Sequence, residues 1–155
     1  FESIQNNFSL NNPRFLDELA QVCKEESISL LPYSPIGGGV LSGKYNGAFY
    51  PKVARFSEYL QNENPRVQAQ ATRFVNEKSL LATTKYMEIA KNLNISPVTL
   101  AVAYSKQFEF VASTIIGARD SEQLDDSFAA MDLELSDTTM KEIQKIQLDV
   151  MYPMG

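Results

Sequence analysis

The chain has 155 residues, 44% of them hydrophobic and 21% charged, which is the composition of one globular domain or a piece of one. Its formal net charge of -5, without any basic run, argues against a nucleic-acid partner, and no apolar run approaches the length of a transmembrane helix. A lone cysteine, Cys23, excludes an internal disulfide and favours a reducing compartment, so we expect a cytoplasmic protein, although a chain that starts without methionine cannot report on targeting.

The first third of the chain is predicted to alternate strands and helices. Residues 3–5 form the exposed end of a strand. Residues 13–26 form a helix with proline near its first position and an apolar stripe that includes Cys23, which we expect to be buried. A second strand covers residues 28–33 and runs straight into a glycine-rich loop.

The middle of the chain is predicted to change from loop to helix. Residues 46–76 contain glycine and prolines among scattered aromatics and predict a long loop with short helices at most. Residues 77–93 carry apolar side chains on one helical face. Ser96 and Pro97 then begin another helix, which we expect to end near Phe108.

The last third is predicted to contain one strand and two helices. The β-branched apolar run at 110–116 predicts a buried strand. A helix follows from Ser121, as its N-cap or first-turn residue, to about residue 131. A final helix covers about 137–149, with Ser136 as its N-cap.

The loop after the second strand has the chemistry of a phosphate site. Residues 37–39 are adjacent glycines, which lack the β-carbons that keep backbone N–H groups away from an anion. Lys44 supplies a mobile charge, and Ser34 and Ser42 supply hydroxyl donors. The spacing matches neither the P-loop nor the Rossmann fingerprint, so a glycine turn with a solvated lysine remains the alternative.

A second anion site is predicted where residues 110–116 turn through Gly117 into the next helix. Arg119 stands beside the start of that helix, where backbone N–H groups and a guanidinium can meet one phosphate. Two separated phosphate sites suggest one ligand with two phosphate groups. A pyrophosphate at the glycine loop and a ribose phosphate at Arg119 describe NADPH.

Both segments resemble the C-terminal part of the aldo-keto reductase superfamily, and they occur in the right order. The segments are YSPIGGGVLSGKY at 33–45 and IIGARDSEQL at 115–124. Residues 3–10 resemble the sixth barrel strand of that superfamily, and the ending Met151-Tyr152-Pro153 resembles its Tas-like branch. The resemblance implies NADP(H) as cofactor and hydride transfer to an aldehyde or ketone, and therefore a small-molecule carbonyl substrate.

The resemblance also implies an α/β fold that is the C-terminal portion of a TIM (β/α)8 barrel. A complete barrel needs roughly 250 residues, so this chain would supply about three of its eight strand-helix units. Three parallel strands cannot close a barrel, and we expect residues 1–155 to be a partial domain whose partner is the missing N-terminal part. A small self-contained three-stranded α/β domain is the alternative.

Cofactor contacts follow from the resemblance position by position. The superfamily usually carries Glu-Asn where this chain has Asp126-Ser127, so the adenine contact departs from its pattern. Tyr33 could also be a half-buried core aromatic, and Arg55 an ordinary surface arginine. The predicted residues are Gln5 for the carboxamide, Tyr33 stacked on the nicotinamide, Ser34, Pro35, Ile36, Gly38 and Lys44 around the pyrophosphate, Arg55 over the phosphates, Gly117, Arg119 and Gln123 at the 2′-phosphate and ribose, and Asp126 with Ser127 at the adenine.

The resemblance leaves this chain without catalytic residues. The proton-donating tyrosine of the superfamily and its supporting lysine, aspartate and histidine lie in earlier barrel strands, and this chain has no histidine. We expect an NADPH-dependent oxidoreductase that is complete only with its N-terminal part. The alternatives are a regulatory nicotinamide-binding subunit resembling potassium-channel β-subunits, and a non-catalytic interaction module with an acidic surface.

Overall fold

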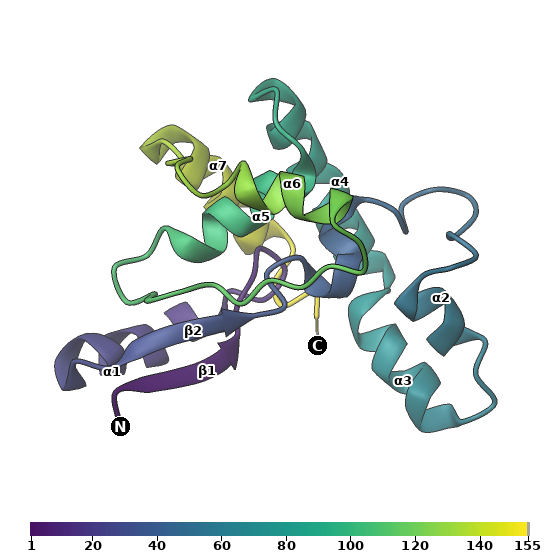
Figure 1. The fold of residues 1–155 in the computed structure, drawn as a ribbon, viewed down its shortest axis with the longest axis horizontal. Helices are drawn as coiled ribbons and strands as arrows, with labels where there is room; N and C mark the ends of the chain where they lie inside the picture. Colours follow the sequence, from purple (N-terminus) through teal and green to yellow (C-terminus); the bar gives the residue numbers. More distant parts are fainter. Residues whose placement is uncertain (155) are drawn as a thin grey trace.

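The computed structural model describes residues 1–154. A short parallel sheet lies on one side of the molecule, most helices pack on the other, and a helical hairpin of α2 and α3 projects at the far end (Figure 1). The elements are β1 Ser3–Asn7, η1 Arg14–Leu16, α1 Leu19–Glu26, β2 Ser29–Tyr33, η2 Gly37–Ser42, α2 Arg55–Leu60, α3 Pro65–Phe74, α4 Glu77–Asn92, α5 Pro97–Lys106, α6 Glu122–Phe128 and α7 Asp137–Asp149.

The three strand segments lie side by side, with β2 between β1 and residues 110–116. β1 pairs in parallel with β2, in a register that runs from Ser3 opposite Ser29 to Asn7 opposite Tyr33. Residues 110–116 run along the other side of β2 through two parallel bridges, Leu30 to Val111 and Tyr33 to Ile115. β2 is therefore the central segment, and the end of the sheet at Tyr33 carries the glycine loop.

The prediction of a buried strand at 110–116 is wrong, and Pro32 in β2 gives a physical reason. Leu30 donates a hydrogen bond to the carbonyl of Phe110 and accepts one from Ala112 at 3.0 Å. Pro32 has no N–H to donate, and its carbonyl accepts from Ile115 at 2.8 Å, one residue later than a regular ladder would place the bond. In the described chain the outer edge of the segment has no strand beside it, and Ile115 is 41% exposed.

The helix predicted at 13–26 is shorter than expected. η1 holds the first turn, and Glu18 then has a φ of -136°, which separates η1 from α1. This break lets Phe15 turn into the core, where it is 2% exposed, while Leu16 stays at the surface. The burial of Cys23 is confirmed, and burial raises the pKa of its thiol.

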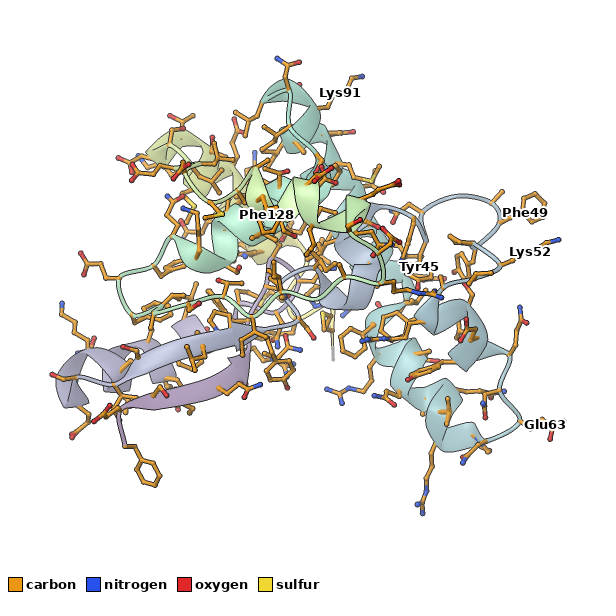
Figure 2. All side chains as sticks on the ribbon, viewed as in Figure 1. Tyr45, Phe49, Lys52, Glu63, Lys91 and Phe128 are labelled. Atoms are coloured by element: carbon orange, nitrogen blue, oxygen red, sulfur yellow. The ribbon has the colours of Figure 1, made fainter. Side chains whose placement is uncertain are left out.

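The predicted long loop at 46–76 contains the two helices α2 and α3. Pro65 occupies the first turn of α3, and the side chain of Asn64 accepts a hydrogen bond from the backbone N–H of Arg66 at 3.0 Å. The ring of Phe56 stacks on Phe74 at 4.9 Å and joins the two helices in a small core of their own. In Figure 2, Tyr45 points inward, where it belongs to this core, whereas Phe49 and Lys52 point outward from the loop before α2.

The later helices match their predicted positions. Asn76, Ser96 and Ser136 each cap a helix with a side-chain oxygen that accepts a backbone N–H three residues on, at 3.0 to 3.2 Å. α4 and α5 pack against each other and against η2, the segment that contains the glycine loop. These contacts hold the loop over the main core. Across residues 1–154, each helix is too short or too polar to span a bilayer.

Candidate functional site: a cationic cleft at the end of the sheet

A cleft of about 320 Å³ lies where the glycine loop faces the turn after residues 110–116. The two segments that the sequence singled out as phosphate sites form its opposite walls, although they lie far apart in the chain. The predicted cofactor residues that line it are Tyr33, Ser34, Pro35, Ile36, Gly38, Lys44, Arg55, Gly117, Arg119, Gln123 and Ser127.

Two predicted residues do not line this cleft. Gln5 is exposed on β1, opposite Leu31 of β2. Asp126 is half-buried on α6, and its backbone carbonyl accepts a hydrogen bond from the Thr99 hydroxyl at 2.8 Å. Their contacts with a carboxamide and an adenine remain predictions.

Sequence reasoning missed the apolar part of the wall. Val102 of α5, together with Ile115, Ile116 and Ala118, lines the cleft beside the polar residues. Ile115 and Ile116 were expected to be buried in a regular strand. The irregular ladder beside Pro32 leaves both of them exposed at the cleft. No motif marks Val102, because only the packing of α5 against η2 brings it to the cleft.

The glycine loop has a backbone conformation that favours glycine and would be strained with other residues. Gly38 and Gly39 have φ angles of 63° and 97°, in the left-handed region that favours glycine. A β-carbon on Gly38 would lie 2.7 Å from the Phe56 ring, and one on Gly39 would lie 2.7 Å from the Lys44 side chain. The end of the Lys44 side chain, Cε and Nζ, therefore lies directly over Gly39.

Ser42 departs from its predicted role. Its hydroxyl donates to the carbonyl of Gly39 at 2.8 Å, so it closes the loop on itself, and it does not line the cleft. Ser34 does line the cleft, with a φ of 56° that turns the chain sharply at the end of β2. Of the two predicted hydroxyl donors, only Ser34 is placed to reach a ligand.

The electrostatics of the cleft favour an anion. Lys44, Arg55 and Arg119 all line it, and no aspartate or glutamate does. Burial and the nearby charges of Arg119 and Arg55 lower the pKa of Lys44. A bound anion would relieve this repulsion, so phosphate is the ligand chemistry that suits the site.

The turn before α6 positions Arg119 through a set of hydrogen bonds. The Asp120 carboxylate accepts from the backbone N–H of Gln123 at 3.1 Å and from its side-chain amide at 2.8 Å. The Gln123 side-chain oxygen, Oε1, in turn accepts from the Arg119 backbone N–H at 3.2 Å, and the Arg119 guanidinium donates to the Val53 backbone carbonyl at 3.3 Å. Ser121 makes no capping hydrogen bond, so Asp120 caps this helix instead.

Gly117 leaves open space in front of this turn. A β-carbon built there would meet no atom within 4 Å, so packing inside the protein does not require glycine. A ligand that lies between Gly117 and Lys44 could therefore contact the backbone of Gly117 directly. Among residues 1–154, no group of three or more His, Cys, Asp or Glu side chains could hold a metal ion.

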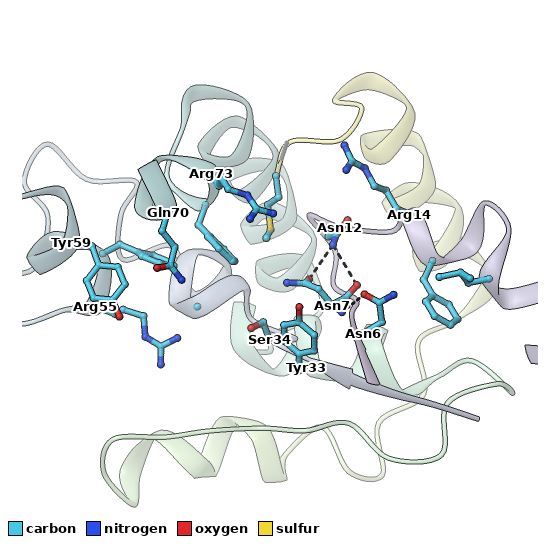
Figure 3. A pocket seen from close by; sticks show the side chains of 16 residues that line it. Asn6, Asn7, Asn12, Arg14, Tyr33, Ser34, Arg55, Tyr59, Gln70 and Arg73 are labelled. Atoms are coloured by element: carbon cyan, nitrogen blue, oxygen red, sulfur yellow. Dashed lines mark hydrogen bonds between the residues drawn. The ribbon is translucent and has the colours of Figure 1, made fainter. Parts of the chain in front are cut away.

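A second cleft of about 530 Å³ adjoins the first (Figure 3). Tyr33, Ser34, Gly38 and Arg55 line both clefts, so the two meet at the carboxyl end of β2. Carboxamide side chains from the end of β1 and the following loop form one wall. Asn12 donates to the Asn7 side chain at 3.1 Å there.

The model of the Aldo/keto reductase family matches residues 1–148, nearly the whole chain. The chain belongs to this family. Within the family it is 34% identical, over 151 residues, to the protein tas of Escherichia coli K12, covering 97% of this chain and 41% of that protein. It is 30% identical, over 145 residues, to the aldo-keto reductase yakc of Schizosaccharomyces pombe, whose name specifies NADP(+), covering 89% of this chain and 38% of that protein.

A solved structure of the family shows the same fold. The glycerol dehydrogenase of Gluconobacter oxydans superposes with a TM-score of 0.73 at 21% identity, over 97% of this chain and 43% of that one. The chain thus spans about two fifths of the length of the relatives it matches. Its fold is the C-terminal portion of an aldo-keto reductase TIM barrel, with about three strand-helix units, as the sequence predicts.

Proposed function

We propose that this chain is the cofactor-binding part of an NADPH-dependent aldo-keto reductase that transfers hydride between a nicotinamide and an aldehyde or ketone. The observation that carries the proposal is the cationic cleft, in which the glycine loop and the Arg119 turn face each other. The catalytic tetrad would lie in the N-terminal part of the barrel, which is the expected partner of this chain.

The residues of the cleft fit such a cofactor. Lys44 and the glycine loop would hold the pyrophosphate, and Arg119 would grip the 2′-phosphate through its guanidinium fork. Tyr33, 39% exposed at the end of β2, would present its ring to the nicotinamide. The cofactor would supply the hydride. The chain's own contribution is to bind and orient it.

Two substitutions, Arg119→Ala and Lys44→Ala, should distinguish the 2′-phosphate site from the pyrophosphate site. In the full-length protein, Arg119→Ala is expected to weaken NADPH binding by about 1.5 to 3 kcal/mol, the range for a hydrogen bond to a charged group, and to leave NADH binding almost unchanged. Lys44→Ala should weaken both cofactors together, because the pyrophosphate is common to both. Fluorescence titration of each variant with NADPH and NADH measures the four affinities.

The decisive result is the difference between Arg119→Ala and Lys44→Ala in their affinities for NADPH and NADH. Equal losses for NADPH and NADH in Arg119→Ala would remove Arg119 from the 2′-phosphate site. Unchanged binding of both cofactors in Lys44→Ala would count against the cleft as the cofactor site. Lys78→Ala is a matched control, because that lysine is exposed at the start of α4 and does not line the cleft.

Cofactor affinity should also depend on pH through Lys44. Its pKa is lowered in the free protein by burial, Arg119 and Arg55, whereas a bound phosphate would favour its charged form. NADPH affinity should therefore fall as the pH rises through the lowered pKa of Lys44. Titrations across a pH series measure this fall, which Lys44→Gln should abolish, and the same fall in Lys44→Gln would assign it to another group.

A regulatory nicotinamide-binding subunit is the second candidate. The chain is also 29% identical, over 75% of its length, to a probable voltage-gated potassium channel subunit beta of Arabidopsis thaliana. Both candidates need the cationic cleft, so cofactor binding does not separate them. Steady-state reduction of an aldehyde by the full-length protein would favour the enzyme, and tight cofactor binding without turnover would favour the regulatory subunit.

A further inference from the structure

The second cleft gathers arginines from three separate elements. Arg14 comes from η1, Arg55 from α2 and Arg73 from α3, and no aspartate or glutamate lines the cleft with them. Figure 3 shows Arg14 and Arg73 projecting from different walls, above the amide side chains at the end of β1. Within residues 1–154 the only salt bridge joins Lys85 and Asp149, so none of these guanidinium groups is in a salt bridge with a described carboxylate.

Contacts around Arg14 hold it at the rim of the cleft. Its guanidinium lies 4.6 Å from the centre of the Tyr152 ring. The hydroxyl of Tyr152, which follows α7, donates a hydrogen bond to the Asp17 carboxylate at 3.1 Å. Met154, 6% exposed, then adds an apolar wall to the cleft. The contact with the Tyr152 ring thus orients Arg14.

The place of this cleft indicates what it would bind. Tyr33, proposed to stack on the nicotinamide, lines both clefts, so the second cleft opens at the reactive end of the proposed cofactor site. A carbonyl group must lie there to receive hydride. Any further group on the same molecule would extend toward α3 and η1, where Arg73 and Arg14 lie.

We propose that the substrates are carbonyl compounds that carry an anionic group, such as a carboxylate, and that Arg73 and Arg14 bind this group. The inference rests on the proposed function of the first cleft. A guanidinium matches a carboxylate with two parallel N–H donors, and the Asn and Gln side chains of the cleft can donate further hydrogen bonds. Arg55 lines both clefts, so the test uses Arg73, which lines only this one.

The test compares two aldehydes of the same shape in the full-length protein. 4-Carboxybenzaldehyde carries the anion, and 4-formylbenzamide is its neutral counterpart. Arg73→Gln is expected to lower kcat/KM for the carboxylate about 10- to 100-fold and to leave that for the amide unchanged, because only the charged hydrogen bond is lost. Arg73→Lys should restore part of the loss, and Arg66→Gln, on the same helix but outside the cleft, should change neither rate.

Other outcomes would overturn either this inference or the proposed function. Equal losses for both aldehydes, or a wild-type preference for the amide, would overturn the inference and leave the proposed function standing. A fall in NADPH affinity in Arg73→Gln would place Arg73 at the cofactor and overturn its role toward the substrate. Wild-type protein that binds NADPH and reduces neither aldehyde also overturns the inference, whereas protein that binds no nicotinamide overturns the proposed function itself.

Discussion

Residues 1–155 on their own should not catalyse aldehyde-dependent oxidation of NADPH. The chain has no histidine, and two of its tyrosines, Tyr86 and Tyr104, are buried and line neither cleft. The hydroxyl of Tyr86 donates to the Leu10 carbonyl, that of Tyr104 accepts from the Gln147 side chain, and burial raises the pKa of both. A positioned general acid typically contributes about 10² to 10⁴ in rate, so its loss alone removes most activity.

The measurement is NADPH absorbance with an aldehyde in excess, for the 155-residue chain and for the full-length protein at equal concentration. The full-length protein is the positive control. A Tyr33→Phe variant of the full-length protein should keep most of its activity, because a phenyl ring can stack as well as a phenol. Aldehyde-dependent turnover by the short chain would contradict the prediction and require a proton donor within these residues.

Elements whose signals are local could be predicted from the sequence. α7 begins after Ser136 because a serine hydroxyl can accept the N–H of the third helical residue, and this chemistry is visible in a few letters. The glycine loop is a similar case, since adjacent glycines and a lysine indicate a phosphate site without any knowledge of distant residues. The same signals at Asn64 and Pro65 were present for α3 but were hidden in a long polar segment.

Features set by tertiary neighbours could not be predicted. An apolar β-branched run such as 110–116 predicts a strand, but whether it is regular depends on the donor that Pro32 fails to supply from another element. The helix cap at Asp120 depends on how the turn closes around Gln123. The second cleft is the clearest example, because Arg14 and Arg73 share no sequence motif and only the packing of α3 brings them to one site.

Phe8→Ala should destabilise the full-length protein by about 3 to 5 kcal/mol, the usual cost of removing a buried aromatic ring. Phe8 is 0% exposed just after β1. Its ring lies 5.6 Å from that of Tyr104 and 5.2 Å from that of Phe108, so it joins the sheet to α5 and to the segment that follows. Loss of the ring would leave a cavity among these aromatics and loosen the strand ends that carry the cationic cleft.

Urea unfolding followed by circular dichroism measures this loss of stability. The urea concentration at the midpoint should fall, and the slope of the unfolding free energy against urea concentration should not change. Phe49→Ala is the matched control, because Phe49 is 92% exposed on the loop before α2 and should change stability by less than about 0.5 kcal/mol. NADPH should raise the midpoint of wild type and of Phe49→Ala alike, since a ligand that binds only the folded state stabilises it. A Phe8→Ala midpoint equal to that of Phe49→Ala would show that the aromatic cluster does not hold the sheet against the helices.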